Sequence, residues 1–417
     1  MPNVRVNNPA EDTQNPDQST QSETAIAAVG SKVAVGFNDS QTTGLFLTAG
    51  SSLTGYAYST NGGKSFTDGG PLPNTPEFVN FGDPWLGSDR SGTMYFSNLA
   101  DDAVNLNLDV SVSASANGGQ TWGTPVPVFR PPINIFYSAD KPALAVGPDP
   151  TVKNRDNVYV AYDDVSLDLN SFTEFTGLPV ARSTDGGKTW QLNYADKFTV
   201  DTTGCSFQQY IGATPIVDPA TGTLDVVAER LSTVDPNCTG TAPTTFSEWF
   251  FKSTDGGQTF APGVKIADIS PAEASGALFL GPGRYMRTIE FPSPALFHNA
   301  IYVAWNDGGQ GNNSHIRLAE STDGGATWTT SFVTHGSGDE VQPALSADNS
   351  GLHLLYYQRN PDNTLDVLLG DSTNGTSFTT TRVSSVSFQG SLTIPQFDPI
   401  IAFGYMGDYI ANVSTGG

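Results

Sequence analysis

The chain has 417 residues, of which 19 are Lys or Arg and 42 are Asp or Glu, so its formal net charge at pH 7 is −23. That charge repels nucleic acid and anionic membrane surfaces, which argues against a nucleic-acid-binding role. No apolar run approaches the ~18 residues that a membrane-spanning helix needs, and we expect no membrane insertion.

Six pairs of short apolar runs follow one another along the chain, and each pair is typical of two adjacent β-strands. We predict that the first run of each pair is the inner strand of a small sheet and that the second run pairs with it. The first runs are residues 23–29, 83–89, 141–146, 214–218, 293–297 and 342–348.

An octet rich in turn-forming residues follows each pair of runs. It reads "STDGGKTW" at 183–190 and recurs in closely similar form at 253–260 and 321–328, with looser copies at 59–66 and 115–122. We expect Asp185 to accept hydrogen bonds from the backbone of its own turn, and Gly186 and Gly187 to take positive φ. Trp190 should bury ~200 Å² beneath the hairpin. The octet is therefore predicted to be a strand-turn-strand clasp.

The first residues of the five octets are 59, 115, 183, 253 and 321, so successive copies are 56, 68, 70 and 68 residues apart. A period of this size holds one four-stranded sheet with its loops. Because one small sheet cannot cover both of its faces, the sheets must stack, and radial stacking gives a β-propeller. A damaged sixth copy at 371–378 keeps Gly375, Ser377 and Phe378 but is expected to lack the Ser and Asp/Asn positions.

The octets resemble the Asp box, or BNR repeat, of sialidases and related propellers, S-x-[DN]-x-G-x-[ST]-[WF]. The resemblance implies a single all-β propeller domain over 1–417, with boxes that serve structure on the face opposite the active site. Six and seven four-stranded blades both fit, because a seventh inner strand is expected at 404–413, inside a truncated blade at 398–417. The N-terminal segment 1–20, with its run "NVRVNN", is expected to close the last blade.

Polar strand ends opposite the boxes are predicted to meet at the mouth of the central channel, where propellers usually bind ligands. Such a ring suits a polyhydroxylated ligand or a cation, although any single member could instead satisfy a turn backbone. Inner strands place Glu23, Asp83, Asp140, Lys141, Thr214, Gln342 and Asp408 there, and second strands place Asp163, Asp164, Glu229, Arg230, Asp307 and Arg359.

The resemblance to sialidases also implies three arginines that clamp a carboxylate, a Tyr nucleophile with a Glu partner, and an Asp acid. Glu23 stands where the first arginine is expected, and a glutamate would repel the carboxylate of sialic acid. Arg230 and either Arg284 or Arg287 could serve as the other two arginines. The nucleophile position reads "EVQPALS" without a tyrosine, and Tyr405 and Tyr409 are the substitutes. Sialic-acid hydrolysis is therefore disfavoured.

A glycosidase for neutral sugars would need two carboxylates ~5 to 10 Å apart. The predicted function is to act on or bind glycans, as a glycosidase rather than a lyase if the protein is an enzyme. A non-catalytic carbohydrate-binding or cell-surface platform stays open, because nothing in the sequence marks a particular pair. The catalytic candidates are Asp307, Glu229, Asp163 and Asp408, and the substrate-binding candidates are Arg230, Arg287, Arg359, Glu23, Asp83, Lys141 and Gln342.

No cofactor is required by this function, but Asp163, Asp164 and Asp168 in "DDVSLDLN" could hold Ca²⁺ through hard oxygen ligands, although their spacing is not that of an EF-hand. Cys205 and Cys238 lack the partners of a zinc site and are predicted to form a disulfide. The bridge favours an extracellular or cell-surface protein, although the chain shows no signal peptide. The expected partner is a glycan, and the oligomeric state is left open.

Overall fold

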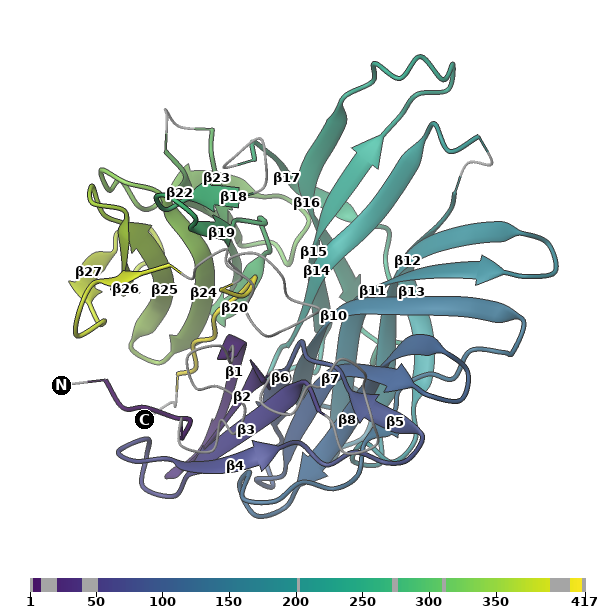
Figure 1. Ribbon diagram of the computed structural model, residues 1–417, viewed down its shortest axis with the longest axis horizontal. Helices are drawn as coiled ribbons and strands as arrows, with labels where there is room; N and C mark the ends of the chain where they lie inside the picture. Colours follow the sequence, from purple (N-terminus) through teal and green to yellow (C-terminus); the bar gives the residue numbers. More distant parts are fainter. Residues whose placement is uncertain are drawn as a thin grey trace. The chain divides into compact units, whose positions relative to one another are not determined.

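The computed structural model describes residues 3–8, 21–39, 52–200, 203–271, 277–309, 313–390 and 406–414 (Figure 1). The described residues form an all-β, propeller-like structure without helices, so none of them belongs to a helix that could span a membrane. The chain divides into two compact units. Unit one comprises Met1–Leu72, Asn117–Thr121 and Ser270–Gly417, and unit two comprises Pro73–Ala116 and Trp122–Ile269.

Unit one contains three antiparallel meanders in which each strand pairs with the next one along the chain. A two-stranded hairpin, β18 (Ala277–Phe279) and β19 (Tyr285–Arg287), precedes the second meander. The first meander consists of β1 (Gln21–Val29), β2 (Lys32–Asp39), β3 (Thr54–Ser59) and β4 (Thr67–Pro71). The second consists of β20 (Ser293–Phe297), β21 (Ala300–Asp307), β22 (His315–Ser321) and β23 (Thr329–Phe332). The third consists of β24 (Glu340–Asp348), β25 (Gly351–Arg359), β26 (Thr364–Ser372) and β27 (Thr379–Arg382), with β28 (Phe388–Gln389) beside β26.

Unit two contains a further three meanders, two of which join through one parallel pair, Ser138 with Leu108. One of these two consists of β6 (Trp85–Ser88), β7 (Met94–Asp102), β8 (Asn107–Ser115) and β9 (Val126–Pro127), with β5 (Phe78–Asn80) also beside β7. The other consists of β10 (Ile135–Pro148), β11 (Asp156–Asp168), β12 (Thr173–Ser183) and β13 (Gln191–Thr199). The third is β14 (Phe207–Val217), β15 (Leu224–Thr233), β16 (Thr244–Ser253) and β17 (Val264–Ile269).

The six predicted inner strands all occur, as β1, β6, β10, β14, β20 and β24. The apolar core lies between neighbouring sheets: Tyr159 of β11 and Val180 of β12 pack with Tyr210 of β14 and Phe251 of β16. This packing is what the stacking argument requires, since one sheet supplies the cover for the next.

The two chain ends differ from the predicted seventh blade. Residues 406–413 of the expected inner strand are described but form no strand, and residues 404 and 405 lie outside the described residues. Residues 3–8 form no strand either. They nevertheless connect two sheets of unit one, because Asn3 donates to the carbonyl of Val383, directly after β27 (3.1 Å), and the Asn8 amide donates to Asp68 of β4 (2.6 Å).

The box at 183–190 has the predicted clasp geometry. Ser183 accepts from the Gly187 amide (2.9 Å) and donates to Asp185 (2.8 Å). Asp185 also accepts from the Thr189 amide (2.9 Å) and hydroxyl (2.6 Å), and φ is +83° at Gly187. Although burial opposes the shift, these hydrogen bonds lower the pKa of Asp185 to about 2.

The sixth box differs from the expectation that its Ser and Asp/Asn positions are lost, and that prediction is wrong. Ser372 accepts from the Gly375 amide (3.0 Å), and Asn374 accepts from the Ser377 amide (3.0 Å), so both roles are filled. The copy lacks one glycine instead, which shifts the serine by one place in the sequence alignment. The clasp tolerates the shorter turn because Gly375 alone supplies the positive φ of +74°.

The boxes also hold neighbouring sheets together. A Cβ atom at Gly375 would lie 2.5 Å from the Tyr302 hydroxyl of the preceding meander, and one at Gly257 would lie 3.3 Å from the Tyr159 ring. Glycine is therefore required there by close approach as well as by φ. This role in packing supports the structural assignment of the boxes.

Replacement of Asp185 by Ala should lower the free energy of unfolding by about 1 to 2 kcal/mol, because the turn loses several hydrogen bonds to this exposed carboxylate. Asp185→Asn should lose less, since Asn61 and Asn117 fill the same position in two other boxes. Urea denaturation of both variants measures the difference. Equal losses for Ala and Asn would contradict the hydrogen-bonding account.

Candidate functional site

Four residues with polar side chains, in or just before inner strands, adopt a left-handed backbone conformation. They are Glu23 (φ 52°), Asp83 (54°), Lys141 (49°) and Gln342 (51°), while β14 has Gly212 (65°). In β1, β10, β14 and β24 the pairing register shifts at this point, which marks a β-bulge. Left-handed backbone costs about 1 to 3 kcal/mol at residues other than glycine and is concentrated at functional sites.

In unit two the bulge of β10 brings four charged residues together. Lys141 Nζ lies 3.0 Å from Asp83 Oδ2, and both side chains are nearly buried. Asp140 precedes Lys141 and pairs directly across the sheet with Asp163 of β11. Asp163 lies away from the box, because the box end of β11 is at Val158, which pairs with Ser183. The group is named the acid cluster: Asp83, Asp140, Lys141 and Asp163.

Asp163 is the most deeply buried carboxyl of the acid cluster. Burial, and next the nearby Asp140, raise the pKa of Asp163 well above its ordinary value, while Lys141 opposes the shift. Among the described residues, no hydrogen-bond partner is present for its buried Oδ1. The arrangement therefore favours a protonated Asp163 next to Asp140, together with a carboxylate at Asp83 that is held by an ammonium group.

In unit one, Glu23, Asp408, Arg287 and Gln342 form a second group, the polar cluster. Glu23 accepts from Asn38 (3.0 Å) and from the Asp408 amide (3.1 Å). Arg287 Nη2 lies 2.5 Å from Asp408 Oδ2, so the buried carboxylate of Asp408 is neutralised. Gln342 donates to the carbonyls of Gly407 (2.7 Å) and Arg287 (3.1 Å). The polar cluster is thus tied together by donors to both carboxylates.

The other candidates have structural partners. Asp307 accepts from Trp305 (3.2 Å), Arg317 (3.1 Å) and the Gly309 amide (2.7 Å). Arg359 forms an ion pair with Asp339 at 3.1 Å. Each of these side chains has its hydrogen-bonding capacity largely engaged, which is typical of groups that fix strand ends.

Glu229 and Arg230 lie on opposite faces of β15. Arg230 is stacked between the Phe198 and Trp249 rings, at 4.9 and 4.8 Å from their centroids. Glu229 is buried and pairs across the sheet with the equally buried Glu248.

The three proposed calcium ligands are not brought together. Asp163 and Asp164 are consecutive in β11 and so point to opposite faces. Asp164 accepts from the Tyr194 hydroxyl (2.6 Å), and Asp168 caps its turn by accepting from the Asn170 amide (2.8 Å). The described part of the chain contains no group of three or more His, Cys, Asp or Glu residues placed to hold a metal ion.

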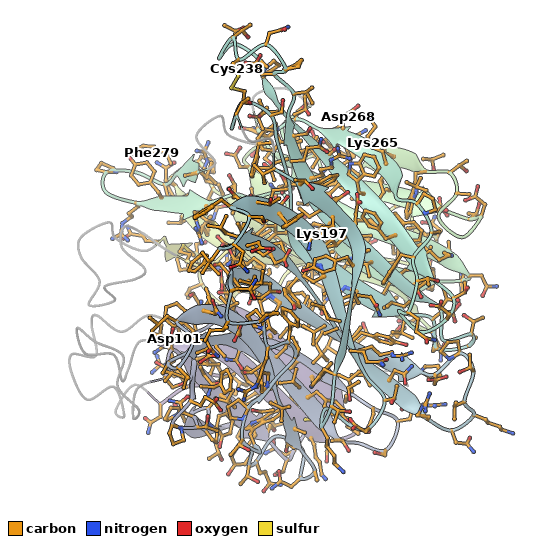
Figure 2. The ribbon with its side chains drawn as sticks, turned by 90° about the vertical axis from the view of Figure 1, so that its right-hand side faces the viewer. Asp101, Lys197, Cys238, Lys265, Asp268 and Phe279 are labelled. Carbon is orange, nitrogen blue, oxygen red and sulfur yellow. A yellow bond between two sulfur atoms is a disulfide. The ribbon has the colours of Figure 1, made fainter. Side chains whose placement is uncertain are left out.

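The predicted disulfide is confirmed. Cys205 and Cys238 are bonded, with their Cα atoms 5.2 Å apart, and Figure 2 shows Cys238 near the tip of an extended loop. The bridge joins the segment before β14 to the loop after β15, at the end of the sheet away from the box. It therefore constrains the loops at the same end of the sheet as Gly212.

Three features of the site could not be identified from residue types alone. Asp140 was placed at the mouth but was not singled out, because its partner Asp163 becomes evident only from the strand register. Gly212, whose amide donates to Asp163, carries no side-chain signal. The left-handed bulge was also missed, since its polar residues precede proline in three strands (Pro84, Pro142 and Pro343) rather than being glycines.

Replacement of Lys141 by Met should lower the free energy of unfolding by about 3 to 5 kcal/mol, because it leaves the nearly buried Asp83 without its ammonium partner. The double variant Lys141→Met/Asp83→Asn should recover most of that loss. Urea denaturation at neutral pH gives the comparison. A double variant no more stable than Lys141→Met would show that the ion pair is not the cause.

The comparisons with known proteins agree with the boxes and the fold. The BNR/Asp-box repeat model matches residues 181–192. No curated protein matches the sequence. A GH93 α-L-arabinofuranosidase of Fusarium graminearum in complex with arabinobiose is similar in structure, with a TM-score of 0.51 and 15% identity over 93% of this chain and 99% of that chain. A mutant of the same enzyme with an iminosugar inhibitor gives a TM-score of 0.52 at the same identity and coverage.

An intramolecular trans-sialidase from Ruminococcus gnavus, in complex with oseltamivir carboxylate, is a more distant match. Its TM-score is 0.45, with 13% identity over 76% of this chain and 86% of that chain. The chain therefore carries a BNR/Asp-box repeat at residues 181–192 and has an all-β, propeller-like fold similar to that of the GH93 α-L-arabinofuranosidase of Fusarium graminearum.

Proposed function

We propose that the protein is an extracellular glycoside hydrolase for neutral glycans and that the acid cluster of unit two carries the chemistry. The observation that supports this proposal is the buried Asp163, whose pKa is raised, directly across the sheet from Asp140 and beside the Lys141–Asp83 ion pair. Carboxyl groups whose environments push their pKa values apart are the usual basis of acid and base roles.

The proposed roles follow from burial. Asp140 is the more exposed member of the Asp140–Asp163 pair, so it contacts the substrate and donates a proton to the leaving glycosidic oxygen. Asp163, its partner across the sheet, shares that proton and keeps it available at neutral pH, because burial and the nearby Asp140 raise the pKa of Asp163. Asp83, oriented by Lys141, acts as the second carboxylate on the other side of the scissile bond, where it takes a proton from the water that attacks the anomeric carbon as the bond to the leaving oxygen breaks. Lys141 is the residue that spaces the two acids, since it follows Asp140 and contacts Asp83.

A neutral substrate is favoured over sialic acid by the charges of both clusters. Lys141 is held by Asp83 and Arg287 by Asp408, so each cation already has a carboxylate partner. Glu23, where a carboxylate-binding arginine would stand, is itself an acid. The structural similarity to an arabinofuranosidase that was solved with arabinobiose supports a neutral pentose glycan as the first substrate to test.

The test is hydrolysis of arabinobiose and of an aryl α-L-arabinofuranoside, with sialyllactose as the comparison substrate. We expect arabinose release and no release of sialic acid. Release of sialic acid alone would contradict the neutral substrate. Calorimetric binding of arabinobiose without turnover would instead establish the non-catalytic platform.

A further inference from the structure

Six large apolar side chains are exposed at one end of the nine-stranded sheet of unit two. They belong to three segments, namely the β7–β8 turn, the residues that lead into β10, and the β11–β12 turn. These segments are neighbours, because the Tyr137 amide donates to Asn107 (3.0 Å) and the Leu169 amide donates to the Asn134 carbonyl (2.8 Å). The six residues, named the tip patch, are Val104, Leu106, Ile133, Phe136, Leu169 and Phe172.

Two residues of the tip patch occupy positions that do not suit them. Leu106 and Phe172 have φ of 58° and 54°, the left-handed conformation that is unfavourable for a bulky side chain. Their side chains are 77% and 76% exposed, so core packing does not compensate for this cost. Strain at exposed residues is evidence for a role outside the folded chain.

A third turn with the same hydrogen bonds provides an internal comparison. In all three turns an aspartate side chain accepts from the amide two residues later, and its carbonyl accepts from the amide four residues later. The fourth residue after the aspartate is Leu106 after Asp102 and Phe172 after Asp168, but Gly222 after Asp218. The glycine lies at the box end of its sheet, whereas Leu106 and Phe172 lie at the opposite end.

We propose that the tip patch inserts into the surface of an electrically neutral lipid bilayer. The exposed parts of the six side chains together amount to roughly 600 Å² of apolar surface, at the upper end of what a monomer exposes. This surface lies on protruding turns, with Ile133 92% exposed, and side chains on such turns can enter lipid without a shaped pocket. The sequence-based expectation of no membrane insertion rested on the absence of a long apolar run. The members of the tip patch are scattered over 69 positions, from 104 to 172, so no such run reveals them.

The backbone of the turns suits a lipid environment. Bilayers lack water to satisfy polar backbone groups, so an inserted turn must satisfy them internally. Asp102 accepts from the amides of Val104 (2.9 Å) and Asn105 (2.9 Å), and its carbonyl accepts from Leu106 (2.8 Å). The side chain of Asp102 is fully buried, so this acceptor stays beneath the tip.

Charges around the tip patch select the kind of bilayer. Asp101, which Figure 2 labels, and Glu174 flank the turns, while Arg130 is paired with Glu77 at 2.9 Å. With a net charge of −23 for the whole chain, an anionic lipid surface would repel this end of unit two. A zwitterionic surface would not, and phosphatidylcholine is therefore the probe.

The test is cosedimentation of the whole chain with phosphatidylcholine vesicles and, separately, with phosphatidylglycerol vesicles. We expect binding to phosphatidylcholine and weaker binding to phosphatidylglycerol at low salt. The double variant Leu106→Gly/Phe172→Gly should bind about a hundredfold less tightly, since each buried side chain contributes roughly tenfold. Its urea midpoint should equal or exceed that of the wild type, because glycine relieves the backbone strain.

Val152, an exposed valine in another turn of unit two, supplies the matched control, and Val152→Gly should bind vesicles like the wild type. In addition, Phe172→Trp should be quenched by brominated phosphatidylcholine beyond the quenching of the six native tryptophans. The proposal is overturned if the wild type does not bind phosphatidylcholine, if the double variant binds equally well, or if phosphatidylglycerol binds more tightly. Concentration-dependent dimers without vesicle binding would identify a protein contact instead.

Discussion

Replacement of Asp140 or Asp83 by Asn is expected to lower kcat/KM for the neutral glycoside by about a hundredfold to ten-thousandfold. The first change removes the group that donates the proton, and the second removes the carboxylate opposite to it, and each role contributes on that scale. Initial rates of arabinose release measure the loss. The folded state should persist in Asp140→Asn, because Asp140 is partly exposed.

Asp163→Asn should change the pH dependence as well as the rate. Burial raises the pKa of Asp163 and keeps the shared proton in place as the pH rises. With Asn at this position the raised pKa of Asp163 is lost, and the basic limb of kcat/KM should move to lower pH. A purely structural role for Asp163 would lower the rate without moving that limb.

Asp225 provides the matched control for these variants. It is a buried aspartate of unit two, burial raises its pKa to about 6, and its neighbour is Lys252 at 3.6 Å. It lies on β15 beside the box strand, because it pairs with Lys252 directly before Ser253. Asp225→Asn should therefore leave kcat/KM unchanged. An equal loss in Asp225→Asn and Asp140→Asn would mean that any buried acid affects the rate through folding.

The repeated sheets could be predicted because their signals are local. The box places its acceptor, donors and glycines within eight residues, so Asp185 and Gly187 could be assigned from spacing alone. The short apolar runs of inner strands such as β10 can be recognised without tertiary information. The sixth box shows the limit of this approach, since the loss of one glycine moved Ser372 out of the expected column although the hydrogen bonds were kept.

The candidate site was predictable only as a set of strand ends. Which carboxyls meet depends on cross-strand register, and register pairs Asp140 with Asp163 but Glu229 with Glu248. A bulge shifts the register by one residue and changes the direction of the side chain at the bulged position. The residue types at Lys141 and Gln342 do not indicate this change. The sequence alone therefore could not separate the acid cluster from structural acids such as Asp307.

Asp109 in β8 shows how a buried acid with no catalytic role should behave. Both of its carboxyl oxygens are buried, and no hydrogen-bond partner for them is found among the described residues. Burial, followed by Asp102, raises its pKa from 3.8 to about 7. Because the folded state prefers the protonated form, its contribution to stability is complete below pH 3.8 and is lost as the pH rises through about 7.

Asp109→Asn should remove this pH dependence and stabilise the protein at pH values above 7. A shift of about three pKa units corresponds to roughly 4 kcal/mol, which is the upper bound for the gain. Other buried acids, including Asp163 and Asp225, give the wild type a slope of the same sign, so the informative quantity is the difference between variant and wild type in urea unfolding at several pH values. That difference should be small below pH 3.8 and grow up to about pH 7. A variant that is destabilised equally at every pH would contradict this account, because it would show that the ionisation of Asp109 does not control the stability.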